Sequence, residues 1–492
     1  MAMATGLESA GDEMGAERQD APVGKLATKV ARNIETEVMR LGWPVGRSLG
    51  SEADLRERFG VSRSVLREAV RLVEHHQVAR MRRGPNGGLF VCAPDAGPAT
   101  RALVIYLEYI GTGVDDLLQA RLLLEPMAAG LAAERLTEDG IATLRAILQA
   151  EADHQDERGI SLQDPFHPEL GRLSGNPVLH LFIDVLTRLT ARYARTSRRI
   201  PKAQVQTAKQ ASHQAHRATV DAVIAGDGAR AQTNLTAHLE AIAAWIREHR
   251  VRQAAHISGS VIEPEQVEGP RAKLAEVVAA RIHDDISARG RQVGSVLGSE
   301  TALIARYRIS RAALREAVRI LEYHSVARMR RGPGGGLIVT EPEPQASIDT
   351  MALFLKYQDV TAEDFHLARN AIELGIVNEV VQRQPGDDVA ERLNAVIQLP
   401  AEGPRMGLAD EFHKELAAIA GNPILALFLN ISTELFRRHA TAQNLTFPQD
   451  PAALTEVQNV HQRILDAVLS GDAELAQHRM RRHLQALTHW WH

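Results

Sequence analysis

Histidines recur in the same arrangement in the two halves of this 492-residue chain. Three histidines in each half match in position, with the last two 22 residues apart: His167, His216 and His238, then His413, His461 and His483. A lone histidine on a helix is usually a core or surface residue, but a repeated set favours ligands. Because this spacing does not put them on one helical turn, they must converge from separate helices, as ligands in a bundle core do.

Three imidazoles suit zinc, nickel or another first-row divalent ion, with a carboxylate or water completing the shell. The nearest acids are Asp164 and Asp410, each three residues before the first histidine of its set. Either could face the site, since residues three and four apart share a helical face. The sequence therefore predicts one divalent metal site in each half.

Arginines form a second pattern, which suits nucleic acid. Arg63 and Arg67 lie one helical turn apart after a serine, and Arg311 and Arg315 repeat them. An arginine in the first turns of a helix can donate to the N7 and O6 acceptors of guanine with both arms of its guanidinium. Surface arginines more often only keep a face solvated. Their repetition beside a second basic element favours DNA binding.

That second element is "VARMRRGPNGGLFV", residues 78–91, which returns as "VARMRRGPGGGLIV", residues 326–339. Each has three arginines, a glycine-rich tip and a short apolar run, which predicts a basic hairpin. Its tip can approach a phosphate or the minor groove. Residues 61–91 and 309–339 align without a gap with 22 identities in 31, so the chain contains an internal duplication.

Helices must position these arginines. In the first half, apolar residues at helical spacing are interrupted at "FGVS", and Ser51 and Ser62 stand where each flanking helix would begin. A serine hydroxyl there accepts from backbone N–H groups that lack a partner in the helix. The pattern predicts helix, tight turn, helix and hairpin, which is a winged helix-turn-helix.

The rest of each half consists of successive amphipathic segments without strand alternation, which predicts an all-α antiparallel bundle. The expected fold class is therefore mainly α, with two winged helix-turn-helix domains and two helical bundles. Aromatic residues make up only 4% of the chain, which also favours helices. The expected divisions are a disordered tail (1–23), a first winged helix (24–93), a first bundle (99–250), a linker (251–270), a second winged helix (271–342) and a second bundle (346–492).

The bulk composition sets further limits. The net charge is -4, so a DNA-binding surface must be a local concentration of arginine. The single cysteine, Cys92, allows no internal disulfide and no cysteine-based metal site, which favours a reducing compartment. No apolar run approaches the roughly 20 residues that cross a bilayer, and the N-terminus is polar and acidic. We expect a cytoplasmic protein with no membrane partner.

The small domains resemble those of bacterial GntR-type transcription regulators. That family has patterns like L-P-S-E, V-S-R-x-x-[VL]-R-E-A-L and G-x-G-x-[FI]-V, where this chain has "LGSE", "VSRSVLREAV" and "GGLFV". Gly50 and Gly298 replace the usual proline, and Ala53 and Thr301 replace a common DNA-contacting arginine, so the operator sequence cannot be inferred from relatives. The resemblance implies DNA contacts from Ser62, Arg63, Ser64, Arg67, Arg82, Arg83, Gly84, Ser310, Arg311, Arg315, Arg330, Arg331 and Gly332.

The bundles resemble the ligand-binding FCD domain of the FadR-like branch of these regulators. The match includes R-x-x-x-E, from Arg121 to Glu125 and from Arg369 to Glu373, and the three histidines of each half. By analogy the histidines bind a divalent metal, and the metal together with Arg121 or Arg369 holds a small carboxylate effector. Without the resemblance, the Arg–Glu spacing would indicate an ordinary contact along a helix.

The first copy departs from the family pattern around its first histidine. Gln163 stands where the family commonly has an aspartate, as does Ala409 in the second copy. Pro165 and Pro168 flank His167, which is tolerable only if Asp164 caps a helix that begins there. We therefore expect the second metal site to be the better occupied one.

The leading hypothesis is a metabolite-responsive transcription regulator, acting as a repressor on double-stranded DNA. One alternative is an enzyme that uses the histidines and a metal to activate water, although "HPEL" and "HKEL" are not the H-E-x-x-H arrangement. Another is an architectural DNA binder whose sensing domains have lost their function. Release from DNA by metal or effector would separate these hypotheses.

The duplication predicts an intrachain pseudo-dimer. Regulators of this kind meet two half-sites roughly 34 Å apart with two recognition helices, and one duplicated chain already contains both. Ala312 replaces Ser64 in the second copy, so the expected operator is an imperfect palindrome. The alternative is further dimerisation across chains, with four winged helices.

Overall fold

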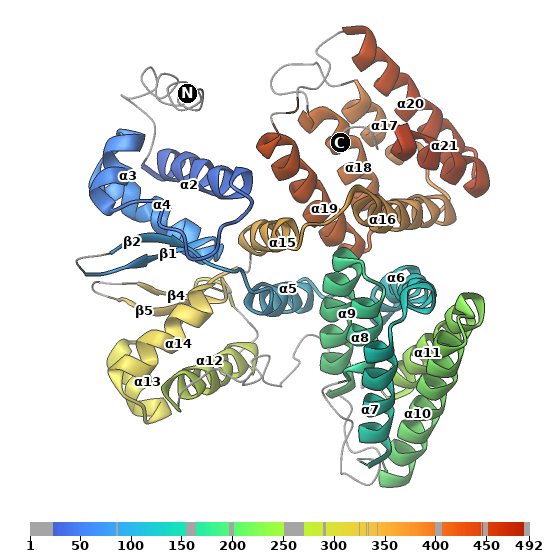
Figure 1. Ribbon diagram of the computed structural model, residues 1–492, viewed down its shortest axis with the longest axis horizontal. Coiled ribbons are helices and arrows are strands. Elements are labelled where there is room, and N and C mark those ends of the chain that lie inside the picture. Colours follow the sequence, from blue (N-terminus) through green and yellow to red (C-terminus); the bar gives the residue numbers. More distant parts are fainter. Residues whose placement is uncertain are drawn as a thin grey trace.

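The computed structural model describes residues 23–84, 87–153, 164–195, 201–249, 270–288, 292–323, 325–330, 332, 334–341, 343–398, 406–443, 445 and 451–486. Its parts are a first small domain (23–92), a first bundle (97–249), a second small domain (270–341) and a second bundle (345–486). The small domains lie on one side of the molecule and the bundles on the other (Figure 1). The predicted tail, up to residue 22, and the predicted linker, from 251 to 269, fall outside the described residues.

The first small domain begins with three helices whose ends follow local signals. They are α2 (Val23–Arg40), α3 (Glu52–Phe59) and α4 (Arg63–His75). The Ser51 hydroxyl accepts from the Asp54 N–H while the Asp54 carboxylate accepts from the Ser51 N–H, so α3 starts in a capping box. It ends at Gly60, whose left-handed backbone (φ 57°) lets the chain turn. The Ser62 hydroxyl accepts from the Val65 N–H and starts α4, as predicted.

One face of α4 forms the core of this domain. Val65, Leu66, Ala69, Val70 and Val73 are buried, and they share a hydrophobic cluster with Ala27, Val30 and Ile34 of α2. At about 25 cal/mol per Å² of apolar surface, a run of buried side chains of this kind is the main force holding the two helices together. The opposite face of α4, which carries the arginines, is left to solvent.

Two strands complete the first small domain. β1 (Ala79–Arg82) pairs antiparallel with β2 (Gly88–Val91), with Ala79 opposite Val91. A Cβ added to Gly88 would stand 2.7 Å from the carbonyl oxygen of Gly50. Only glycine allows the second strand to pass this close to the chain that leads into α3.

The second small domain repeats this arrangement with an extra strand. Its elements are α12 (Pro270–Ala288), β3 (Val296–Gly298), α13 (Glu300–Tyr307), α14 (Arg311–Tyr323), β4 (Ala327–Arg330) and β5 (Gly336–Val339). β3 pairs with β5, whereas the first domain has only an isolated bridge between Ser48 and Phe90. Sequence reasoning missed β3 because three residues are too few to show an alternating pattern.

Seven helices form each bundle in the described part of the chain. The first has α5 (Gly97–Tyr109), α6 (Val114–Arg135), α7 (Glu138–Asp153), α8 (Phe166–Leu173), α9 (Pro177–Arg195), α10 (Lys202–Ile224) and α11 (Gly228–His249). The second has α15 (Gln345–Tyr357), α16 (Ala362–Gln382), α17 (Asp387–Ile397), α18 (Met406–Ala420), α19 (Pro423–Ala442), α20 (Pro451–Leu469) and α21 (Ala473–Ala486). Among the described helices, none is both long and apolar enough to span a bilayer.

The two bundles share one hydrophobic core. Phe182 of α9 stacks on Phe428 of α19 with ring centroids 4.1 Å apart, and the two rings end the equivalent stretches "GNPVLHLF" and "GNPILALF". Such self-pairing is what a two-fold interface produces. Reciprocal hydrogen bonds run from the Asn176 amide to the Asp364 carbonyl (3.0 Å) and from the Asn422 amide to the Asp116 carbonyl (3.1 Å).

Each small domain docks on the bundle of the other half. Leu353 of α15 and Ala442 of α19 belong to the hydrophobic cluster of the first small domain. Ile105 of α5, the equivalent of Leu353 at an offset of 248 residues, belongs to the cluster of the second. Trp43 also packs edge-on against Tyr357, with ring centroids 5.6 Å apart. A small domain and the bundle it contacts therefore come from different halves of the sequence.

A buried ion-pair network joins the first small domain to the second bundle. Glu35 of α2, 1% exposed, accepts from Arg438 Nη1 at 2.6 Å and lies 2.6 Å from His76 Nδ1. Arg438 also contacts Glu434 at 2.6 Å and Asp349 at 3.4 Å. The contact between the second small domain and the first bundle cannot repeat this network. The residues equivalent to Glu35, Asp349 and Glu434 are basic there: His283, Arg101 and Arg188.

Candidate DNA-reading surface and metal centres

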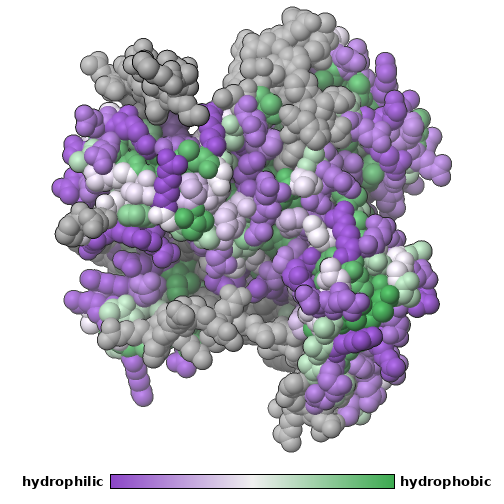
Figure 2. Space-filling view, in the orientation of Figure 1, coloured by the Kyte–Doolittle hydropathy of each residue, from purple (hydrophilic) through white to green (hydrophobic). Residues whose placement is uncertain are grey.

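The predicted recognition arginines lie on the solvent side of α4 and α14. The side chains of Arg63, Arg67, Arg311 and Arg315 are 62% to 69% exposed. In the space-filling view, strongly hydrophilic residues project along the side of the molecule formed by the small domains (Figure 2).

The serines that we associated with DNA contacts start these helices. Ser62 and Ser310 are both exposed, and the Ser310 hydroxyl accepts from the Ala313 N–H at 3.1 Å, as Ser62 does in the first copy. The Ser64 hydroxyl lies 2.9 Å from that of Ser62. Ala312 cannot make this contact, so the two helices present different polar groups at their first turn.

In each small domain one carboxylate oxygen lies between the two recognition arginines. Glu52 Oε1 is 2.7 Å from Arg63 Nε and 3.4 Å from Arg67 Nε. The hydrogen bond from Arg63 lowers the pKa of Glu52 from its ordinary value, so this carboxylate is ionised at neutral pH. Sequence reasoning missed this residue, although a glutamate occupies the first position of the preceding helix in both copies: Glu52 and Glu300.

The described wing residues are exposed. Arg82 lies with its guanidinium carbon 4.4 Å from the centre of the Phe90 ring, and Arg83 and Gly84 are in solvent. In the second copy, Arg330 Nη2 donates to the carbonyl of Gly334 at 2.9 Å, and Gly332 is exposed. Arg331 falls outside the described residues.

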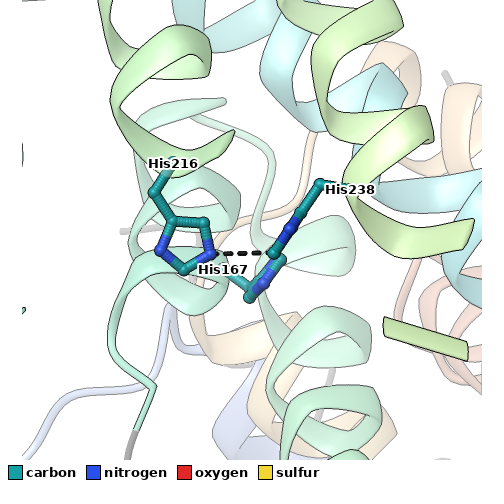
Figure 3. A group of neighbouring side chains, drawn as sticks. All are labelled: His167, His216 and His238. Carbon is teal, nitrogen blue, oxygen red and sulfur yellow. Dashed lines mark hydrogen bonds between the residues drawn. The ribbon is translucent and has the colours of Figure 1, made fainter. Parts of the chain in front are cut away.

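The histidines of the first half converge from α8, α10 and α11, and Figure 3 shows their rings turned toward one another. His216 Nε2 lies 2.9 Å from His238 Nε2, and one ring nitrogen from each of the three falls within 4.8 Å of the others. All three are buried, with 2%, 2% and 4% exposure for His167, His216 and His238. The structure thus brings together the three residues that the sequence proposed.

Carboxylates lie beside the Nδ1 atoms of two of these rings. His167 Nδ1 is 2.7 Å from Glu125, and His216 Nδ1 is 2.8 Å from Glu151. An ionised carboxylate beside Nδ1 favours the tautomer that carries its proton there, leaving a lone pair on Nε2. Both ring nitrogens of His167 are buried without a hydrogen-bond partner among the described residues, although Nδ1 lies 2.7 Å from Glu125. Three buried imidazole nitrogens within 4.8 Å of one another form a donor set that fits one divalent metal ion.

The second half repeats the arrangement with α18, α20 and α21. His483 Nε2 lies 3.1 Å from His413 Nε2 and 3.2 Å from His461 Nε2. His413 Nδ1 contacts Glu373, the counterpart of Glu125. The Phe412 ring stacks on His461 with centroids 4.1 Å apart, as Phe166 does on His216 at 3.9 Å.

Burial and neighbouring histidines keep three of the six rings neutral. Burial, followed by the nearby His413, lowers the pKa of His461 to about 2 and that of His483 to about 3. Burial and the adjacent His216 and His167 lower the pKa of His238 well below its usual range. A neutral imidazole is the form that binds a metal ion, so His238, His461 and His483 are in the required state at neutral pH.

The two candidate aspartates are placed differently. Asp164 Oδ2 lies 3.6 Å from His167 Nε2, and its Oδ1 accepts from the Phe166 N–H at 3.1 Å, next to the start of α8. The prolines around His167 lie at this helix start, where Pro165 is the N-cap residue, so the better occupancy of the second site stays a prediction. Desolvation raises the pKa of Asp164, but the charges of His167 and His216 outweigh it and lower the pKa overall. Burial raises the pKa of Asp410.

The two predicted effector arginines are buried beside the histidines. Arg121 pairs with Glu125 through Nε and Nη2, and its Nη1 donates to the Thr190 hydroxyl at 3.1 Å. Arg369 Nε donates to Glu373 at 2.6 Å. Each arginine–glutamate pair is therefore a contact along one helix. The glutamate of each pair also contacts the first histidine of the triad in the same bundle. Sequence reasoning missed Glu151, because nothing on α7 marks it as a partner of a residue 65 positions away.

Comparison with known proteins places these parts in families. Residues 116–241 and 364–486, half of the chain together, match the model described as FCD domain. Residues 26–91 match the model described as bacterial regulatory proteins, gntR family. The chain is 32% identical over 200 residues to the HTH-type transcriptional regulator LutR of Bacillus subtilis, covering 39% of this chain and 89% of that protein.

Two other relatives match similar portions. The Uxu operon regulator of Haemophilus influenzae is 29% identical over 162 residues, covering 32% of this chain and 58% of the relative. The HTH-type transcriptional repressor NanR of Enterobacter is 25% identical over 225 residues, covering 45% and 85%. Among solved structures, Streptococcus agalactiae GntR aligns with 44% of this chain and 99% of that one, at a TM-score of 0.32 and 22% identity.

Proposed function

We propose that this chain, a member of the gntR family of bacterial regulatory proteins with two FCD domains, is an effector-controlled regulator. Both of its small domains bind one operator, and the chain releases that operator when a small carboxylate binds. Its class is that of a DNA-binding transcription regulator rather than an enzyme. The finer parts of the proposal are a repressor acting in the bacterial cytoplasm, a second DNA-binding winged helix, and the domain divisions given above.

One observation carries this proposal: the exposed arginine pair at the start of α4 recurs on α14 in the same setting. Both copies have a serine cap, a helix with one buried and one basic face, and a basic hairpin behind it. The gntR model matches only the first copy, over residues 26–91. The repeated fold of α12 to β5 supports a second DNA-binding domain of the same kind.

The histidine sets support metal-dependent effector binding in the bundles. His167, His216 and His238 would hold one divalent ion with Asp164 nearby, and the second set would hold another: His413, His461 and His483, with Asp410 as a candidate fourth ligand. A bound divalent ion supplies a positive centre that accepts a carboxylate oxygen. Zinc and nickel both suit three imidazoles.

Arg121 and Arg369 are the residues proposed to hold the other end of the effector. Arg121 Nη1 has the Thr190 hydroxyl as its hydrogen-bond partner, at 3.1 Å. A carboxylate that displaced this hydroxyl would form a charge-assisted hydrogen bond, which is roughly twice as strong as a neutral one. Regulation then requires that the carboxylate changes operator affinity, whereas an architectural DNA binder would be insensitive to it.

Alanine substitution of the recognition arginines tests DNA reading. Arg63→Ala, Arg67→Ala, Arg311→Ala and Arg315→Ala should each weaken binding to a genomic fragment that the chain retains by about 1–3 kcal/mol, with relaxed preference at one base position. Arg82→Ala and Arg330→Ala in the wings should weaken binding to all sequences alike and reduce its salt dependence. Gel-shift titrations at several salt concentrations measure both effects.

Arg172→Ala is the matched control, since Arg172 is 53% exposed but lies on α8 of the first bundle, paired with Glu169. It should leave DNA binding unchanged. Unchanged affinity in all four recognition variants would contradict the assignment of α4 and α14.

A second prediction concerns stoichiometry. The bundles of one chain already form a two-fold-like interface, and each small domain docks across it, so one chain should occupy one operator with two unequal half-sites. Light scattering of the complex with a short duplex gives its mass directly. A mass corresponding to two chains on a single palindrome would show instead that the copies dimerise across chains.

A further inference from the structure

A glutamate stands beside the arginine pair of each small domain, in a position with no assigned role. Glu52 Oε1 lies 2.7 Å from Arg63 Nε and 3.4 Å from Arg67 Nε. The helices α3 and α13 otherwise differ at most positions, reading "EADLRERF" and "ETALIARY", yet the geometry recurs in the second copy. There Glu300 Oε1 is 3.3 Å from Arg311 Nε and 3.4 Å from Arg315 Nε.

The contacted atom matters for how an arginine reads a base. A guanidinium can donate to guanine through its two terminal nitrogens, or sideways through Nε and one of them. A carboxylate beside Nε occupies the edge formed by Nε and one terminal nitrogen, and it leaves Nη1 and Nη2 available to donate to a base. It also offsets the repulsion between two cations one helical turn apart.

We propose that Glu52 and Glu300 are positioning residues that hold the recognition arginines in an end-on orientation, so that these arginines discriminate between bases. The inference rests on the proposed DNA-binding function and adds the source of its specificity. Neither glutamate needs to touch DNA for this role.

A simpler account is that an acid at the first position of a helix interacts favourably with the helix dipole. That account does not require the carboxylate to turn toward the following helix. In both copies it does so, and Glu300 Oε1 is shielded from solvent, with the two arginines as its ion-pair partners but no hydrogen bond to either. An ordinary exposed ion pair would contribute little stability, so the expected effect is on base discrimination rather than on folding.

The test compares Glu52→Gln with Glu37→Gln in the full-length chain. Both glutamates are 35% exposed and pair with an arginine, but Glu37 pairs with Arg58 and not with the recognition helix. The probes are a genomic fragment that the wild type retains and a scrambled duplex of the same length and composition. The readout is the ratio of the two affinities, at one salt concentration, for each variant.

Glu52→Gln should lower this ratio at least about fivefold, the smaller limit of what one bidentate arginine contributes. Binding to the scrambled duplex should stay equal or tighten, because a negative charge has been removed near the phosphates. Glu37→Gln should leave the ratio unchanged. Glu300→Gln should act in the same way on the other half-site.

The effect must also depend on the arginines. In an Arg63→Ala, Arg67→Ala background, Glu52→Gln should change the ratio no further, because positioning residues act through the groups they hold. A persisting effect would show that the carboxylate reads a base itself and would overturn the proposal. The proposal would also be overturned if Glu52→Gln and Glu37→Gln gave the same ratio of affinities, or if Glu52→Gln raised the affinity for both duplexes equally. A wild type that prefers no genomic fragment over the scrambled duplex would instead refute the DNA-reading function.

Discussion

Replacing Arg438 with methionine should lower the free energy of unfolding by about 3–5 kcal/mol, because it strips a buried cluster of acids of its counter-charge. Arg438 is 5% exposed and contacts Glu35, Asp349 and Glu434, which are 1%, 13% and 11% exposed. Urea unfolding followed by circular dichroism measures the loss. Since the network joins α2 to α19, amide hydrogen exchange in α2 should rise as well.

Arg437→Met is a matched control on the same helix. Arg437 also pairs with Glu434, through a hydrogen bond of 2.8 Å, but its side chain is 34% exposed. A pair that reaches solvent contributes about 0–1 kcal/mol, so this substitution should cost little. Adding Glu35→Gln to Arg438→Met should cost less than the sum of the two changes, because it removes a charge left unpaired. Equal effects of the Arg437 and Arg438 variants would contradict a special role for the network.

Acid should weaken the same contact. Burial raises the pKa of Glu35, but the hydrogen bond from His76 and the charge of Arg438 outweigh it and lower the pKa to about 2 from its ordinary 4.5. A carboxyl group with a lowered pKa stabilises the folded state fully above its unfolded pKa. That stabilisation, about 3 kcal/mol from the size of the shift, is lost as the pH falls from 4.5 towards 2.

Removal of a single histidine ligand should abolish one metal site. The chain should bind two divalent ions after exchange into zinc or nickel, and His238→Ala or His483→Ala should each leave one, because the remaining imidazoles no longer complete a three-nitrogen set. Elemental analysis of the purified variants measures the content. Metal at about 100 times its dissociation constant should stabilise the wild type by about 2.7 kcal/mol per site, which thermal unfolding detects.

His249→Ala is the control, since His249 shares α11 with His238 but bonds to the carbonyl of Trp245. It should keep both ions. Glu373→Gln should keep the histidines yet weaken the second site about 10–100-fold, because the carboxylate beside His413 fixes which nitrogen carries the proton. If His238→Ala and His483→Ala both keep the metal content of the wild type, the histidines are structural residues and not ligands.

Local elements and the family could be predicted from the sequence. Ser51 and Ser62 marked helix starts, the turn between α3 and α4 followed from the break in apolar spacing, and the hairpin followed from its glycines. The class of DNA-binding regulator with FCD domains is confirmed by the family matches. The metal, the carboxylate effector and the operator remain predictions.

The convergence of the histidines was predictable in part. Repetition of three histidines at matching positions indicated that they act together, and the structure places each set at one point. The carboxylates behind them were not predictable, because Glu151 lies 65 positions from His216 and belongs to no repeated motif. The glutamate of α3 shows the same limit, since an acid at a helix start has a sufficient local explanation.

What the sequence by itself determined is the mainly helical class, the helix-turn-helix and hairpin of the first small domain, the internal repeat, and the residues proposed to meet DNA and metal. These depend on caps, turns and periodicities that act between neighbours along the chain. Only the tertiary structure decided that each small domain docks on the bundle of the other half, and that Glu35 meets Arg438 across 403 residues. Such contacts depend on complementary shape and charge between distant surfaces, and no local pattern encodes them.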